Sequence, residues 1–99
     1  MVKLLMVWDI REGKESAYME FVVHELSPGL SQLGLTITDA WYTIAGEGPQ
    51  VVLGGVASDR QTLEQILEHP DWKRLQSKLL EYVRNYRHKI TTPQGLFQL

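Results

Sequence analysis

The chain has 99 residues, of which 43% are hydrophobic and 22% charged, so it has room for one globular domain and does not have the composition of a disordered chain. Its formal net charge of −2 provides no basic surface for nucleic acid or for an anionic membrane, and neither is expected as a partner. It contains no cysteine, which excludes disulfides, thiolate metal sites and cysteine nucleophiles.

The first predicted element is a strand over residues 2–10, VKLLMVWDI, which is rich in β-branched and aromatic side chains. Both of its faces carry apolar residues, so we expect the strand to be covered on two sides. The apolar run stops at Asp9 without a cleavage site, and no stretch approaches the roughly 20 apolar residues that cross a bilayer. We therefore expect a cytoplasmic protein with a single domain over residues 1–99.

A helix is predicted from residue 13 to about residue 33, because apolar side chains such as Tyr18 and Leu26 recur at helical spacing. Pro28 cannot donate a backbone hydrogen bond, and its ring crowds the preceding turn, so we expect a kink or a break after Leu26. Gly34 then supplies the end of the helix.

Two strands at about residues 35–45 and 50–58, joined by the turn sequence GEGP, predict a β-hairpin. Trp41 and Tyr42 are adjacent in the first of these strands and therefore point to opposite faces. The pair Gly54–Gly55 interrupts the second strand. We interpret these glycines as making room for the Trp41 indole, and a ligand close to the backbone is the alternative.

Two helices and a short strand are predicted to complete the chain. The first helix begins at Ser58 or Asp59, where Ser58 and Gln61 fit the capping-box pattern, and it ends at the sequence EHP. The second begins near Pro70 and continues to Tyr86, because apolar residues recur at steps of three and four. The sequence HKITTP then predicts a short strand, and QGLFQL is an apolar tail.

The predicted order is β-α-β-β-α-β, with the second helical unit in two pieces. This order is typical of the ferredoxin-like fold, an α+β fold with a four-stranded antiparallel sheet and its helices on one face. The other face of the sheet still carries apolar side chains, which is rare on a soluble monomer. We therefore expect a homodimer through the open sheet face, with two sheets facing each other in a barrel and the tail at residues 95–99 reaching onto the partner.

Three stretches, VWDIREGKESAYMEFV, WYTIAGEGPQVVLGGVAS and LEQILEHPDWKRLQSKLLEYV, resemble the dimeric α/β-barrel superfamily. This superfamily includes antibiotic-biosynthesis-monooxygenase-like, NIPSNAP-like and stress-responsive barrel domains. The last stretch carries most of the resemblance, with a short helix, a His-Pro break and a helix that opens with Trp72. The resemblance covers nearly the whole chain, and it implies a pocket between the sheet and the helices or inside the barrel.

The same resemblance bears on one activity. Cofactor-free quinol oxygenases of this superfamily use an asparagine, a tryptophan and a histidine around the pocket. Trp72 matches that tryptophan, but the first strand offers Asp9 and no asparagine, and the next histidine after Trp72 is His88. Because the triad is incomplete, a cofactor-free monooxygenase, isomerase or cyclase is an alternative and not the main prediction.

His24 and Asp39 are the catalytic candidates. His24 is the best placed of the three histidines for a ligand or acid–base role, although a lone histidine at a helix edge is more often structural. Asp39 and Asp9 are carboxylates within apolar strands, where burial would raise their pKa and suit them to proton transfer. The interpretation that we favour for both is a carboxylate at a strand end that is either exposed or paired with Lys3 or Arg11. No histidines or carboxylates have the spacing of a metal site, and we expect no cofactor.

Tyr18, Trp41 and Tyr42 are predicted to line an apolar pocket, and the resemblance adds Trp72 to these ligand-binding residues. The main prediction is a small dimeric protein that binds a small apolar or aromatic molecule. The same aromatic residues could equally be core and interface packing, in which case the protein is a non-catalytic dimerisation or accessory module.

Overall fold

The computed structural model describes residues 1–43 and 48–92, and its elements follow the predicted order. The expected contact of residues 95–99 with a partner lies outside the described residues, as does part of the hairpin turn. The elements are β1 Val2–Ile10, α1 Glu15–Phe21, the π-helical turn η1 Val22–Leu26, α2 Ser27–Leu33, β2 Thr36–Tyr42, β3 Val51–Ala57, α3 Arg60–Glu68, α4 Pro70–Tyr82 and β4 Val83–Thr91.

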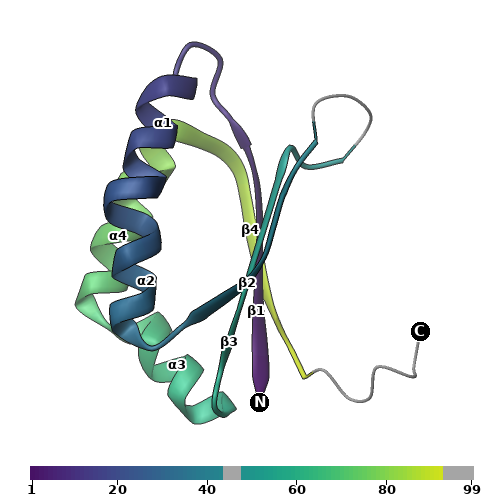
Figure 1. Ribbon diagram of the computed structural model, residues 1–99, viewed down its shortest axis with the longest axis vertical. Coiled ribbons are helices and arrows are strands. Elements are labelled where there is room, and N and C mark those ends of the chain that lie inside the picture. The colour runs from purple at the N-terminus through teal and green to yellow at the C-terminus, as the bar shows by residue number, and fades with distance from the viewer. Residues whose placement is uncertain (44–47, 93–99) are drawn as a thin grey trace.

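The four strands form one antiparallel sheet in the order β2-β3-β1-β4. The helices lie together on one face of the sheet, and among the described residues no helix lies on the opposite face (Figure 1). The predicted ferredoxin-like fold is therefore confirmed. The even-numbered side chains of β1 are buried beneath the helices, whereas the odd-numbered ones lie half-buried on the open face.

The core lies between the helices and this inner face of the sheet. Burying a leucine-sized side chain contributes about 1.5–3 kcal/mol, so this layer provides most of the stability of the fold. Its most deeply buried large side chains are Trp8, Trp72, Leu4, Met6, Leu26, Leu30, Leu35, Leu63, Leu79 and Val83.

A kink or a break is expected after Leu26, and of these the break is wrong, because α1, η1 and α2 form one continuous helical unit. The turn that precedes α2 is π-helical, which means that its hydrogen bonds join residues five apart. Pro28 lies in the first turn of α2, directly after the wider turn η1. A proline is tolerated in a first helical turn. The buried residues step by five from Phe21 to Leu26, and the wider turn keeps both of them on the core side. Gly34 ends the helix as predicted, in the left-handed conformation.

The last strand is longer than predicted, because α4 ends at Tyr82 and not at Tyr86. Val83 and Tyr86 continue the helical spacing, yet they belong to β4, which pairs with β1 along most of its length. Asn85, with φ of 58°, lies at an irregularity in that pairing next to Asp9. Backbone hydrogen bonds to a neighbouring strand thus outweigh a helical pattern in the local sequence.

The helix α3 is capped by a different residue from the one predicted. The Asp59 carboxylate accepts a hydrogen bond from the backbone N–H of Thr62 at 2.7 Å, so Asp59 is the N-cap and the proposed capping box of Ser58 and Gln61 is wrong. Ser58 instead bonds the Thr62 hydroxyl at 3.3 Å. Within the described residues, none of the helices is both long and apolar enough to span a membrane.

The two glycines of β3 do not make room for Trp41, so that interpretation is wrong. A Cβ on Gly55 would lie 2.7 Å from Cγ of Leu35, and a Cβ on Gly54 would lie 2.7 Å from Oδ2 of Asp39. Both distances are too short for a real contact. The glycines therefore accommodate a buried leucine on the inner face and a carboxylate on the open face.

Candidate functional site

An apolar cavity of about 410 Å³ lies between the first helical unit and the sheet. Side chains from α1 and η1 form one wall, and side chains from β1, β3 and β2 form the other. Its volume is within the range of about 300–1,000 Å³ that is typical of small-molecule sites. The lining residues are Trp8, Ile10, Glu15, Tyr18, Met19, Val22, Ala40, Trp41, Tyr42, Val51 and Leu53.

Trp8 and Tyr18 form a buried polar contact in this cavity. The Nε1–H of Trp8 donates a hydrogen bond to the hydroxyl oxygen of Tyr18 at 3.0 Å, and the two side chains are 1% and 4% exposed. Their rings meet edge to face, with 6.3 Å between centroids. Trp8 also stacks on Tyr86, with 6.1 Å between centroids, so aromatic neighbours fix the indole on two sides.

The hydroxyl of Tyr18 keeps a proton that it can donate. Burial raises the pKa of the Tyr18 phenol, the hydrogen bond from Trp8 partly offsets that rise, and the Tyr42 phenol adds to it. The phenol is therefore protonated at neutral pH. An indole N–H can only donate, so the oxygen of Tyr18 is the acceptor in the bond to Trp8. Among residues 1–43 and 48–92, the structure assigns no acceptor to the remaining hydroxyl proton.

Three of the four predicted ligand-binding residues border the cavity. Tyr18 lies in its buried part, whereas Trp41 and Tyr42, which are 68% and 56% exposed, border it at the edge strand β2. Tyr42 is on the inner face, opposite Val51, and Trp41 is on the open face, opposite Val52. Trp72 is 2% exposed in the first turn of α4 and belongs to the core, away from the cavity lining. Trp8 also lines the cavity, although its position in the sequence indicates only that it belongs to a strand. Knowing which face of β1 meets the helices would have placed it in the pocket.

The two catalytic candidates lie apart from each other and outside the cavity lining. His24 is exposed on η1 and borders a polar groove on the outer side of the helices. Asp39 lies on β2, and its carboxylate pairs with Lys3 of β1. The contact from Lys3 lowers the pKa of Asp39, with a smaller contribution from the Thr38 hydroxyl. The pairing of Asp39 with Lys3 is thus confirmed, and the net rise of its pKa expected from burial is wrong, because the Lys3 contact outweighs desolvation.

Asp9 likewise has donors around its carboxylate. One oxygen accepts a hydrogen bond from the Asn85 side chain at 2.9 Å, and the other accepts one from the backbone N–H of Gln50 at 2.9 Å. These two bonds, in that order, lower the pKa of Asp9, so the expected rise is wrong here too. The Gln50 side chain also accepts a bond from the backbone N–H of Ile10 at 2.7 Å, and together these contacts join the hairpin to the end of β1.

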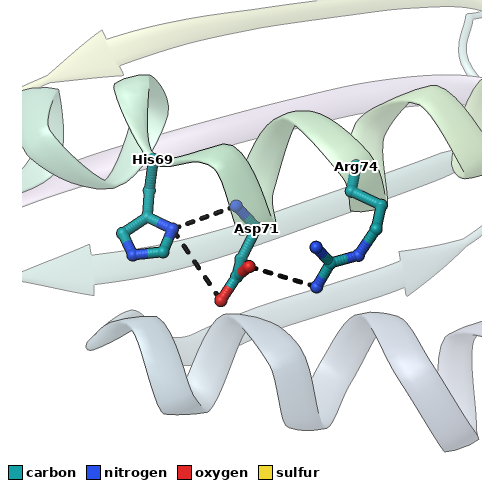
Figure 2. A network of polar contacts seen from close by, with 3 residues as sticks. All are labelled: His69, Asp71 and Arg74. Atoms are coloured by element: carbon teal, nitrogen blue, oxygen red, sulfur yellow. Dashed lines mark hydrogen bonds and ion pairs between the residues drawn. The ribbon is translucent and has the colours of Figure 1, made fainter.

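The polar groove beside His24 contains the network drawn in Figure 2. Nδ1 of His69 accepts a hydrogen bond from the backbone N–H of Asp71 at 3.0 Å, and the Asp71 carboxylate pairs with Arg74 at 3.1 Å. His69 is thus the N-cap of α4, and Pro70 follows in the first turn, which accounts for the break between α3 and α4. Within the described residues, no three histidine or carboxylate side chains gather in the manner of a metal site.

The open face of the sheet is apolar in its centre and charged at its edges. Valines and a leucine of the two central strands form the centre, and the Lys3–Asp39 pair borders it on one side. Arg87 and Lys89 of β4, which pair with Val7 and Leu5, border it on the other side. A shallow hollow of about 360 Å³ on this face is lined by Leu5, Val7, Pro49, Val52, Arg87, His88 and Lys89.

A scan against protein-family models and a search of curated proteins find no match to this chain. Solved structures do match it. A dabb family protein with a ferredoxin-like fold from Mesorhizobium loti has a TM-score of 0.76 at 14% identity, with 95% of this chain and 97% of that chain covered. An uncharacterized NIPSNAP domain protein from Burkholderia xenovorans has a TM-score of 0.72 at 16% identity, with 97% of each chain covered.

A third match is a protein from Nitrosomonas europaea, provisionally described as an antibiotic biosynthesis monooxygenase. It has a TM-score of 0.69 at 13% identity, with 98% of this chain and all 100% of that chain covered. The three structures represent the domain types that the sequence resembles. At these identities the likeness shows a common fold, so the predicted superfamily resemblance is confirmed for the fold.

Proposed function

We propose that the protein binds a small, largely apolar aromatic molecule in the cavity between α1 and the sheet. The observation that carries this proposal is a cavity of about 410 Å³ with aromatic and aliphatic walls and one buried hydroxyl, that of Tyr18. Small-molecule sites commonly combine mostly apolar walls with a few polar groups that orient the ligand. Protein interiors are otherwise close-packed, and apolar walls that stay open to water forgo the free energy of burial.

Filling the cavity tests this proposal. Ala40 lies on β2 in the lining, so Ala40→Phe is expected to abolish saturable binding of a neutral naphthalene fluorophore, measured as an increase and blue shift of its emission. Ala17→Phe is the matched control, because Ala17 is exposed on α1 and outside this lining. Equal binding by the two folded variants, or no saturable binding by the unmodified protein, would contradict the proposal.

We also propose that the protein is a homodimer in which the two open sheet faces pack against each other. The apolar centre of this face, formed by Leu5 and Val7 of β1 and Val52 and Val56 of β3, supports the proposal. Contiguous apolar patches on a soluble protein usually mark an interface, and a second copy offers a surface of the same kind. The charged residues at the edges of the face would then form the polar rim of the interface.

A single charge in the centre of this face tests the dimer. Val7 and Val52 are directly paired in the middle of the sheet, so Val7→Lys is expected to convert a dimer into a monomer in sedimentation equilibrium at micromolar concentration. Val23→Lys is the matched control, because Val23 is 57% exposed on the helical side. The dimer is refuted if the unmodified protein sediments as a single chain of 11.4 kDa.

The geometry supports binding better than acid–base catalysis. Glu15 is the one charged residue among the described lining residues, and the catalytic candidates His24 and Asp39 lie elsewhere. A non-catalytic dimerisation module is the second candidate, because the open apolar face exists independently of the cavity. A stable dimer that binds no aromatic probe in the cavity would favour this second candidate over the first.

A further inference from the structure

The polar groups of the cavity restrict the chemistry of its ligand. Its lining includes the indole N–H of Trp8, which is already engaged with the oxygen of Tyr18 at 3.0 Å. That bond uses Tyr18 as an acceptor and leaves its hydroxyl proton for a further acceptor. A hydroxyl that accepts one hydrogen bond becomes a stronger donor in the next, because the two bonds polarise each other.

The charges around the cavity restrict the ligand further. Glu15, at the start of α1, is the one charged side chain among the described lining residues, and the lining includes no lysine, arginine or histidine. An anionic ligand would lose its hydration without gaining a cationic partner, and it would also approach the carboxylate of Glu15. An uncharged ligand meets neither penalty.

Resting on the proposed function of this cavity, we propose that its ligand is an uncharged aromatic compound with a carbonyl group, and that the hydroxyl of Tyr18 donates a hydrogen bond to the carbonyl oxygen. Tyr18 and Glu15 are then the specificity-determining residues of the site. Tyr18 selects ligands with an acceptor, and Glu15 disfavours anions. The phenol of Tyr18 remains a donor at neutral pH because burial raises its pKa.

Three probes of nearly equal size separate these effects: acetylnaphthalene, ethylnaphthalene and naphthoate. We expect the protein to bind acetylnaphthalene about threefold to tenfold more tightly than ethylnaphthalene, the range of one net hydrogen bond, and naphthoate most weakly. Tyr18→Phe should remove the preference for the ketone and leave the affinity for ethylnaphthalene within about twofold. Glu15→Gln should improve the binding of naphthoate alone.

Tyr42→Phe is the matched control, because Tyr42 is the other phenol of the lining. Loss of the ketone preference in this variant and not in Tyr18→Phe would overturn the assignment of the donor. If Tyr18→Phe does not fold, the carbonyl stretch of acetylnaphthalene bound to the unmodified protein gives the answer. A shift to lower wavenumber than in hexane supports the hydrogen bond, and an unshifted band overturns it.

The outcomes also separate this inference from the proposed function. If none of the three probes binds, the cavity is not a ligand site and both proposals are wrong. If acetylnaphthalene and ethylnaphthalene bind equally, and Ala40→Phe abolishes both, the cavity is a ligand site but the carbonyl inference is wrong. Tighter binding of naphthoate than of the ketone would overturn the expected neutrality of the ligand.

Discussion

The substitution Gly55→Ala probes the packing between the sheet and the helices. A Cβ at this position would lie 2.7 and 2.8 Å from two carbons of Leu35 and 3.1 Å from the backbone oxygen of Thr36. Leu35 is 1% exposed, so it has little space to move. Overpacking of this kind costs about 1–3 kcal/mol, and replacing a strand glycine by alanine recovers about 0.5–1 kcal/mol. We expect Gly55→Ala to lower the free energy of unfolding by up to about 2.5 kcal/mol, with a central value of about 1 kcal/mol.

Gly54→Ala is the matched control, one residue away and on the opposite face. Its contacts would be Oδ2 of Asp39 at 2.7 Å, Cδ2 of Leu5 at 3.1 Å and Cβ of Asp39 at 3.2 Å, and both of these side chains lie on the open face, where they can shift. The loss of this half-buried ion pair costs about 1 kcal/mol, the upper end of the range for surface pairs, and the removal of a strand glycine offsets about 0.5–1 kcal/mol of it. Urea unfolding followed by circular dichroism, at a fixed protein concentration, gives both values. Equal destabilisation, or a larger loss for Gly54→Ala, would refute the assigned faces of β3.

Three further predictions concern side chains that make hydrogen bonds in separate parts of the fold. Tyr18→Phe leaves the buried Nε1–H of Trp8 without its acceptor, and urea unfolding should show a loss of about 1–3 kcal/mol. His69→Ala removes the cap on the Asp71 N–H and should cost about 0.5–2 kcal/mol, whereas His69→Asn, a good cap, should cost less in the same assay. Asp9 has a lower pKa in the folded state, so its stabilising effect is present above the ordinary value of 3.8 and is lost as the pH falls through the folded-state pKa. The unfolding midpoint of Asp9→Asn should therefore fall less steeply than that of the unmodified protein as the pH drops below about 5, and parallel pH profiles would contradict this reasoning.

Features with a local physical cause could be predicted from the sequence. The strand at residues 2–10 was bounded correctly because β-branched and aromatic residues fill it from end to end. Gly34 and Pro70 marked helix boundaries because one tolerates the left-handed conformation and the other fits the first turn. The order of elements then led to the ferredoxin-like fold, since few topologies satisfy it.

Features that depend on distant partners could not be predicted from the local pattern. The helical spacing from Trp72 to Tyr86 continues past the end of α4, and only pairing with β1 turns Val83 and its neighbours into a strand. The face of β1 that meets the helices was also undetermined, because both faces are apolar. This left Trp8 unassigned. Tyr18, Trp41 and Tyr42, chosen for their amphipathic character, border the cavity, whereas Trp72, which was taken from the resemblance, lies in the core away from it.

The π-helical turn η1 sets the relative rotation of the two halves of the first helical unit. Each residue of an α-helix turns the chain by about 100°, so a regular α-helix in place of η1 would put Leu26, five residues after Phe21, about 140° around the axis from it. Leu26 and Leu30 would then face solvent while Tyr18 and Phe21 stayed inside. Deleting one residue of this turn would leave Phe21 and Leu26 four positions apart, a spacing at which a regular α-helix also keeps both on the buried face.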